Sequence, residues 1–95
     1  MKHYTKKEWE QSIKQDKNAQ IIDVRSAEEF EEKHWPGALQ INVENPQKFM
    51  DHIDKLDKDK NYYLYCNSGK RSNQACLVME YNGFKNLFNL EDGLQ

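Results

Sequence analysis

The sequence predicts an α/β fold, with a small and mainly parallel sheet and helices on both of its faces. Short β-branched or aromatic runs alternate with helix-forming segments along all 95 residues, a pattern typical of strands joined by helical crossovers. Two of the helices begin with the spacing of a capping box, and no linker rich in Pro, Gly or Ser interrupts the alternation. A chain of this length supports one hydrophobic core, so we expect a single domain over residues 1–95.

The first helix is expected over residues 6–15. Thr5 and Glu8 have the spacing of its capping box, in which the hydroxyl and the carboxylate each satisfy a free backbone amide. Trp9 and Ile13 lie four residues apart and give this helix one apolar stripe.

A short strand is expected next, over residues 20–24, because the segment is rich in β-branched side chains. Ser26 and Glu29 then repeat the capping-box spacing, with Phe30 directly after them. This part of the chain therefore predicts a strand, a tight turn and a helix.

The middle of the chain begins with a break at residues 35–37, which contain Pro and Gly. Residues 38–43 are expected to form another strand, after which Asn45 offers a helix cap and Pro46 the first helical position. The apolar side chains expected along that helix are Phe49, Ile53 and Leu56.

The last third of the chain contains the strongest strand signal, at residues 62–66. A helix is expected over residues 72–82 and ends at Gly83, which can adopt the left-handed conformation of a helix terminus. Residues 87–90 are expected to form the final strand.

Composition and charge exclude several classes of function. The 14 basic and 16 acidic residues give a net charge of −2, and without a long basic run this disfavours nucleic acid or an anionic membrane as a partner. No apolar stretch approaches a membrane span or a secretory signal, so we expect a cytoplasmic protein. Two cysteines make no disulfide framework, and neither has a Cys or His at zinc-ligand spacing, so no metal site is expected.

The topology restricts where a site can lie. Ligands of parallel α/β sheets bind beyond the carboxyl ends of the strands, so the turns after Val24, Val43 and Cys66 are the positions of interest. The last of these turns joins the strongest strand to a helix. Its residues are Cys66, Asn67, Ser68, Gly69, Lys70, Arg71 and Ser72.

This turn can hold an anion. Its backbone amides can curl around the Cys66 sulfur while the helix amino end directs partial positive charge there. Gly69 permits the positive φ that such a curl requires, Lys70 and Arg71 add cations, and Ser72 can donate a hydroxyl hydrogen bond. We therefore predict that Cys66 has a depressed pKa and acts as a nucleophile.

The alternative is that Cys66 is a buried cysteine at the end of a strand and that the turn is merely solvated. The two arginines of the chain, Arg25 and Arg71, both follow predicted strands, which favours the functional interpretation. Cys76 lies on a helix beside Ala75, where a thiol in the core is expected.

Several segments of the sequence resemble the single-domain rhodaneses, a family of sulfurtransferases, over about residues 20–93. The resemblance is strongest in the active-site loop. The segments that carry it are Ile21-Ile22-Asp23-Val24-Arg25 with Glu28-Glu29-Phe30, His34-Trp35-Pro36-Gly37-Ala38, Tyr65-Cys66-Asn67-Ser68-Gly69-Lys70-Arg71-Ser72 and Gly83-Phe84-Lys85-Asn86-Leu87.

The resemblance implies that Cys66 takes a sulfane sulfur from an anionic donor, thiosulfate or a persulfide, and passes it from a cysteine persulfide to cyanide or to a thiol, on a small molecule or a protein. It implies no metal or organic cofactor. The amides of residues 67–71 would stabilise the sulfur anion, Lys70 and Arg71 would attract the donor, and Asp23 and Arg25 would support the loop. The oligomeric state is not predicted.

Two alternatives stay open at the level of sequence. Phosphatases and arsenate reductases with the same sheet have one more residue between Cys and Arg than the four between Cys66 and Arg71, so the present loop is better suited to a single sulfur atom. A module that carries sulfur between proteins, or that regulates without turnover, is the other alternative. The chain also departs from the family pattern at Lys33, at Trp35 and in its ending, which has Asp92-Gly93 where a Gly-Gly pair is common.

Overall fold

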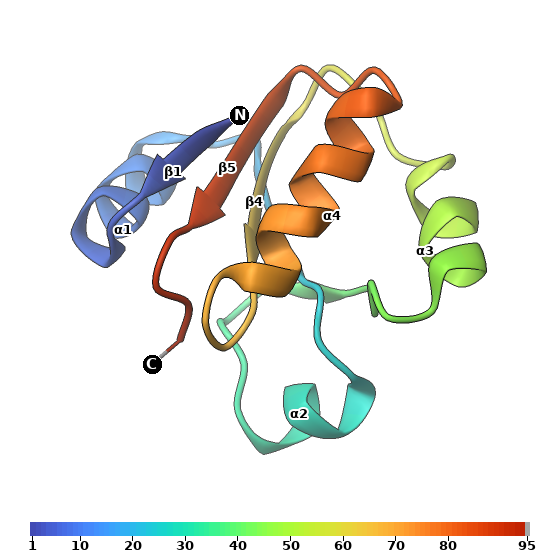
Figure 1. Cartoon of the computed structure of the whole chain (residues 1–95). Helices are drawn as coiled ribbons and strands as arrows, with labels where there is room; N and C mark the ends of the chain where they lie inside the picture. The colour runs from blue at the N-terminus through green and yellow to red at the C-terminus, as the bar shows by residue number, and fades with distance from the viewer. Residues whose placement is uncertain (95) are drawn as a thin grey trace.

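The computed structural model describes residues 1–94 and contains a five-stranded sheet in which all neighbouring strands are parallel (Figure 1). The strand order is β1-β5-β4-β2-β3, which confirms the predicted α/β class. The strands are β1 (Lys2–Tyr4), β2 (Ala19–Asp23), β3 (Leu39–Gln40), β4 (Asn61–Tyr65) and β5 (Asn86–Leu90). The helices are α1 (Lys6–Gln15), α2 (Ala27–Glu32), α3 (Pro46–Ile53) and α4 (Lys70–Tyr81).

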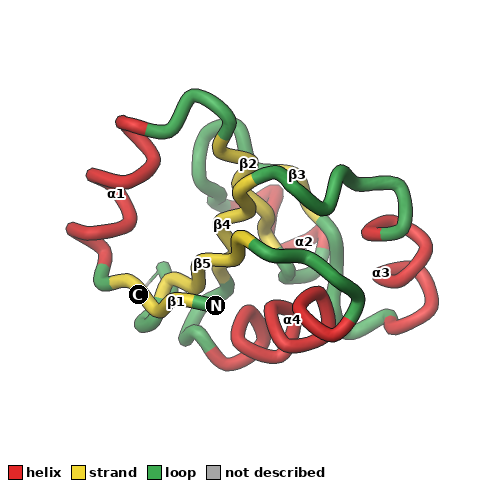
Figure 2. Tube along the Cα trace, turned by 90° about the horizontal axis from the view of Figure 1, so that it is seen from above, coloured by secondary structure: helices red, strands yellow, loops and turns green. Residues whose placement is uncertain are grey.

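Helices cover both faces of the sheet. Figure 2 shows α1 on one side of the strands and α3 and α4 on the other. The short helix α2 lies beyond the ends of the strands (Figure 1). Because side chains alternate along a strand, the sheet separates two apolar cores, one under α3 and α4 and one under α1.

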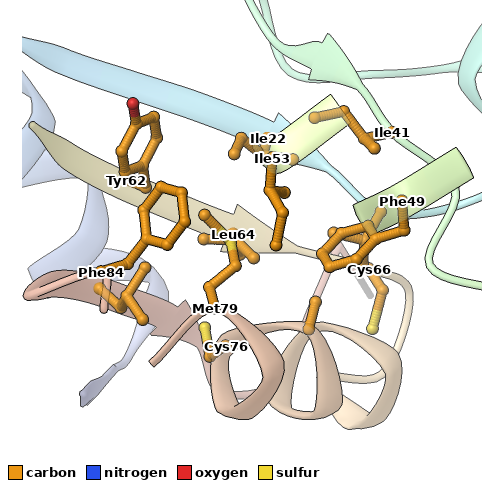
Figure 3. Close-up of a cluster of buried hydrophobic side chains, with 13 residues drawn as sticks. Ile22, Ile41, Phe49, Ile53, Tyr62, Leu64, Cys66, Cys76, Met79 and Phe84 are labelled. Carbon is orange, nitrogen blue, oxygen red and sulfur yellow. The ribbon is translucent and has the colours of Figure 1, made fainter. Parts of the chain in front are cut away.

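The core under α3 and α4 is the larger one (Figure 3). Ile22 and Leu64 from the sheet pack against Phe49 and Ile53 of α3 and against Met79 of α4, and all five are at most 2% exposed. Full burial of such a side chain stabilises the fold by about 1.5–3 kcal/mol. The predicted apolar side chains Phe49 and Ile53 of α3 therefore face the core. Leu56 lies beyond the end of this helix and is only half-buried against the core.

The core under α1 is centred on Trp9, whose side chain is fully buried. Its ring meets the edges or faces of Trp35, Tyr63 and Tyr65 at centroid distances of 5.8, 5.5 and 6.2 Å. Edge-to-face pairs of this kind stabilise beyond the area that they bury.

The predicted helix caps are confirmed. Both capping boxes form, with the hydroxyl and the carboxylate of each satisfying the backbone as expected. Asn45 Oδ1 accepts from the amide of Lys48, and Gly83 after α4 has φ 91°. The capping-box residues are Thr5 with Glu8 and Ser26 with Glu29.

Two strands differ from the sequence prediction. Only Leu39–Gln40 of the expected strand 38–43 forms a regular ladder, because this segment is the edge of the sheet and soon leaves it. Ile41 and Val43 still donate to the backbone of β2 and the residue after it. The strand β1 was not predicted, since its three residues are mostly exposed and form a strand only by pairing with β5.

No helix within residues 1–94 is both long enough and apolar enough to span a bilayer. The carboxyl ends of β2, β4 and β5 meet at the edge of the sheet where the chain passes from β4 into α4 (Figure 1). The predicted loop therefore lies at the position where α/β sheets bind their ligands.

Candidate active site

The loop between β4 and α4 places Cys66 at the carboxyl end of the sheet. Cys66 directly follows the last residue of β4, and α4 begins four residues later, two residues before the predicted start. Gly69 precedes the helix with φ 90°, a conformation that disfavours any residue with a side chain. The chain thereby curls back so that the first turn of α4 approaches the sulfur.

The Cys66 sulfur accepts two backbone hydrogen bonds within this curl. The amide of Gly69 lies 3.1 Å from Sγ and that of Ser72 lies 3.4 Å from it, while the Ser72 hydroxyl is 3.5 Å away. Burial of the side chain would raise the pKa of the Cys66 thiol, but the hydrogen bonds from Ser72, Ser68 and Gly69 outweigh burial and lower this pKa below its ordinary value. The arrangement therefore favours a thiolate, the nucleophilic form of cysteine.

Asp23 and Arg25, at the end of β2, form a buried ion pair beside this loop. Arg25 Nη2 lies 2.7 Å from Asp23 Oδ2, and the pair is almost entirely shielded from solvent. The hydrogen bond to Asp23 raises the pKa of the Arg25 guanidinium despite burial. Arg25 also donates from Nη1 to Asn67 Oδ1 at 3.0 Å and from Nη2 to the Lys33 carbonyl at 2.6 Å, so the ion pair contacts the loop through Asn67.

Tyr65 extends this network, although it was predicted only as a residue of the strand. Its hydroxyl donates to Asp23 Oδ2 at 2.7 Å and accepts from the backbone amide of Trp35 at 2.9 Å. Burial and the bond to Asp23 raise the pKa of Tyr65, so the hydroxyl stays protonated. The strand before Cys66 is thus joined to the turn at residues 35–37.

Arg71 is paired with two carboxylates. It binds both carboxylate oxygens of Glu29 at 2.9 Å and Glu44 Oε1 at 3.2 Å. Asn67 Nδ2 also donates to Glu29, at 2.7 Å. The hydrogen bonds from Arg71 lower the pKa of Glu29 to about 2. The positive charge of Arg71 is therefore largely compensated at the loop.

Glu29 was predicted only as part of a helix cap, and the structure adds its contacts to the loop. The available signal was its position in the first turn of a helix that directly follows the carboxyl end of a strand. The carboxylate satisfies Ser26 through Oε1 and reaches Arg71 and Asn67 as well. One side chain thus stabilises α2 and fixes it to the cysteine loop.

Ser68 and Lys70 are the exposed members of the loop. Within the described residues 1–94, Lys70 makes no salt bridge. Of the two predicted cations of the loop, Lys70 is therefore the one whose charge faces solvent without a bound carboxylate.

The segment after β5 packs on the cysteine loop. The amide of Leu94 donates to the Cys66 carbonyl at 3.0 Å. Gly93 has φ 71°, and a Cβ at this position would lie 2.2 Å from the Asn67 carbonyl oxygen. A Cβ on Gly69 would lie 2.0 Å from the Glu91 carbonyl oxygen. Close backbone contacts require both glycines. For Gly93, the only signal in the sequence was its place in Asp92-Gly93, where the family commonly has a Gly-Gly pair.

Cys76 lies apart from this site. Cys76 lies on α4 with its side chain in the core near Met79, whereas Cys66 lies in the loop before this helix (Figure 3). Burial raises the pKa of Cys76 to about 12, so this thiol stays protonated near neutral pH. Cys76 therefore lies in the core, as predicted.

Comparison with known proteins places these features in a family. A sequence model of the rhodanese-like domain matches residues 5–95. The crystal structure of a rhodanese-like domain protein from Staphylococcus aureus superposes with a TM-score of 0.86 at 31% identity, covering 99% of this chain and 88% of that one.

Two curated relatives are longer proteins. The putative sulfur carrier protein YrkF of Bacillus subtilis (strain 168) is 32% identical over 87 residues, which cover 92% of this chain and 45% of that protein. A tRNA uridine(34) hydroxylase of Sodalis glossinidius is 32% identical over 95 residues, which cover 97% of this chain and 27% of that protein. The chain therefore spans less than half the length of these relatives.

Proposed function

The chain belongs to the rhodanese-like domain family, and from this premise we propose that it transfers a sulfane sulfur through a persulfide on Cys66. The donor is a small anionic sulfur compound such as thiosulfate, and the acceptor is cyanide or a thiol. The observation that carries the proposal is the Cys66 sulfur held by the amides of Gly69 and Ser72 at the carboxyl end of the sheet.

The reaction proceeds in two displacements. The Cys66 thiolate attacks the outer sulfur of thiosulfate, a new S–S bond forms, and sulfite leaves with the electron pair of the broken S–S bond. The outer sulfur of the resulting persulfide is then attacked by cyanide or by an acceptor thiolate. That bond breaks toward Cys66, which leaves as the thiolate, and no proton or external electron is consumed.

The loop stabilises the charge that moves between these sulfur atoms. The two amides that hold the thiolate are fixed before the reaction, so they need no reorganisation as charge shifts along the S–S bond. Lys70 supplies the uncompensated positive charge at the mouth of the loop. Arg71 is available to an anionic donor to the extent that Glu29 and Glu44 release it.

A thiosulfate and cyanide assay tests the proposal. Wild-type protein is expected to form thiocyanate, Cys66→Ser to form none, and Cys76→Ser to retain near-normal activity because its thiol lies in the core. Equal loss of activity in both variants would contradict the roles given to the two cysteines. Hydrolysis of an aryl phosphate faster than thiocyanate formation would instead indicate phosphatase chemistry.

A sulfur carrier is the second candidate, in which Cys66 receives and gives its sulfur only in contact with other proteins. Two observations favour it: the Cys66 side chain is fully buried, and the charge of Arg71 is compensated by Glu29 and Glu44. Both weaken the attraction of a free dianion to the sulfur. The name of the B. subtilis relative points in the same direction.

The mass of the intact protein separates the two candidates. The protein is incubated with thiosulfate or with a cysteine desulfurase and its substrate, and the gain of one sulfur atom at Cys66 is measured. Loading by thiosulfate supports the enzyme. Loading by the desulfurase alone supports the carrier, and loading by neither contradicts both.

A further inference from the structure

A line of polar side chains leads from the reactive sulfur to the edge of the sheet. The Ser72 hydroxyl, 3.5 Å from Cys66 Sγ, donates to Asn89 Oδ1 at 2.5 Å. Asn89 Nδ2 lies 3.2 Å from Nδ1 of His3. Ser72 is fully buried and Asn89 is 2% exposed, whereas His3 is exposed on β1, in register with Asn89 on β5. The two displacements proposed above use neither Asn89 nor His3.

Ser72 has one hydroxyl proton and three acceptors nearby. Asn89 Oδ1 is the nearest at 2.5 Å, followed by the Gly69 carbonyl at 3.2 Å and the Cys66 sulfur at 3.5 Å. A proton donated to Asn89 is withheld from the sulfur, because a hydroxyl donates only one hydrogen bond. In this setting the hydroxyl supports the Cys66 thiolate less than it would if its proton were committed to the sulfur.

The direction in which the Ser72 hydroxyl donates depends on which end of the Asn89 side-chain amide faces it. The amide oxygen only accepts and the amide nitrogen only donates. With its nitrogen toward Ser72, Asn89 would donate to the hydroxyl oxygen and free the hydroxyl proton. The Cys66 thiolate, which carries a full charge, is then a stronger acceptor for this proton than the Gly69 carbonyl. His3 Nδ1 accepts from the Asn89 nitrogen, and it thereby holds that nitrogen away from Ser72.

We propose that Asn89 and His3 are positioning residues that set the direction of the Ser72 hydroxyl and, through it, how readily Cys66 ionises. Loss of the His3 acceptor lets the Asn89 amide turn, so the thiolate becomes more populated near neutral pH. The consequence for sulfur transfer rests on the proposed function, but the ionisation of Cys66 is measurable without any sulfur donor.

The test is the pH dependence of iodoacetamide alkylation at Cys66, followed by peptide mass in folded protein. His3→Ala is expected to lower the midpoint of this pH dependence by about half a pH unit. Below the midpoint, this corresponds to alkylation that is about threefold faster. His3→Asn, whose side-chain oxygen can replace Nδ1, should keep the wild-type midpoint, as should His52→Ala, an exposed histidine on α3.

The same measurement in Ser72→Ala protein shows whether the effect of His3 acts through the Ser72 hydroxyl. In Ser72→Ala protein, His3→Ala should leave the midpoint unchanged. Asn89→Asp, which has only acceptor oxygens, should raise the midpoint when Ser72 is present, and by less when it is absent. A wild-type midpoint in His3→Ala, or a shift that persists in Ser72→Ala protein, would overturn the proposal. Absence of sulfur transfer together with the expected midpoint shifts would count against the proposed function alone.

Discussion

The two arginines of the chain both follow a strand, yet they occupy different environments. Arg25 and its partner Asp23 are almost completely shielded, with side-chain exposures of 5% and 0%. Arg71 and Glu29 keep exposures of 25% and 30%. Removing one partner of a buried pair leaves an uncompensated charge in the interior, whereas water solvates what remains of an exposed pair.

Substitution of these arginines should therefore separate stability from donor use. Arg25→Ala is expected to lower the free energy of unfolding by about 3–5 kcal/mol. Arg71→Ala should lower it by about 1 kcal/mol or less, while slowing reaction with thiosulfate. Urea denaturation and a thiosulfate assay on the two variants measure this. A larger loss of stability in Arg71→Ala than in Arg25→Ala would contradict the assigned environments.

Glu29 makes the free energy of unfolding depend on pH in the acid range. Its pKa is about 2 in the folded chain, against an ordinary value of 4.5. A carboxylate with a lowered pKa stabilises the fold fully above its ordinary value, and this stabilisation is lost as the pH falls from about 4.5 toward 2. Because the side chain is partly exposed, solvent screening reduces the energy involved.

Glu29→Gln should flatten the pH dependence of the unfolding free energy between about 4.5 and 2. The matched control is Glu28→Gln, which removes an exposed carboxylate from the same helix. Denaturant titrations across this pH range provide the measurement. If both variants change the slope equally, the contact with Arg71 is not its origin.

At the level of elements, the sequence predicted those helices and strands whose signals are local. The capping boxes of α1 and α2 form because the hydroxyl and the carboxylate lie three residues apart and need no other part of the chain. The strand β1 and the shortness of β3 depend instead on their positions at the two edges of the sheet. No local pattern encodes such a position.

The contact between the chain after β5 and the cysteine loop is also non-local, and two glycines test it. Gly93→Ala should destabilise the fold and slow alkylation of Cys66, because the new Cβ would collide with the Asn67 carbonyl. Gly37→Ala is the matched control, since Gly37 has φ 81° but nothing within 4 Å of the added Cβ. Its cost should be backbone strain alone, about 1–2 kcal/mol.

Thermal unfolding and the alkylation rate of Cys66 distinguish the two glycine variants. The expected result is a normal alkylation rate in Gly37→Ala and a reduced one in Gly93→Ala. A normal rate in Gly93→Ala would show that the loop does not depend on the packing of this segment.

For the whole molecule, the position of the cysteine loop could be predicted from the sequence, but its surroundings could not. Residues 66–72 are contiguous and follow a recognisable strand, so their position at the carboxyl end of the sheet could be predicted. The pairing of Glu29 with Arg71 joins residues 42 apart, and the bond from Ser72 to Asn89 joins residues 17 apart. Such contacts depend on how the strands are ordered and how deeply α4 packs, which spacing does not encode.

The sheet gives the two thiols of one core opposite properties. Cys66 meets the amide-lined turn at the end of β4, which lowers its pKa, whereas burial in the core raises the pKa of Cys76 to about 12. The proposed reactivity of Cys66 therefore depends on the folded chain and should disappear on unfolding.

The effect of the fold on the Cys66 thiol can be measured by comparing the pH dependence of its alkylation in folded protein and in protein unfolded by urea. We expect a lower midpoint in the folded state, because only there do the amides of Gly69 and Ser72 hold the sulfur. A folded-state midpoint equal to or above that of the unfolded chain would contradict this expectation.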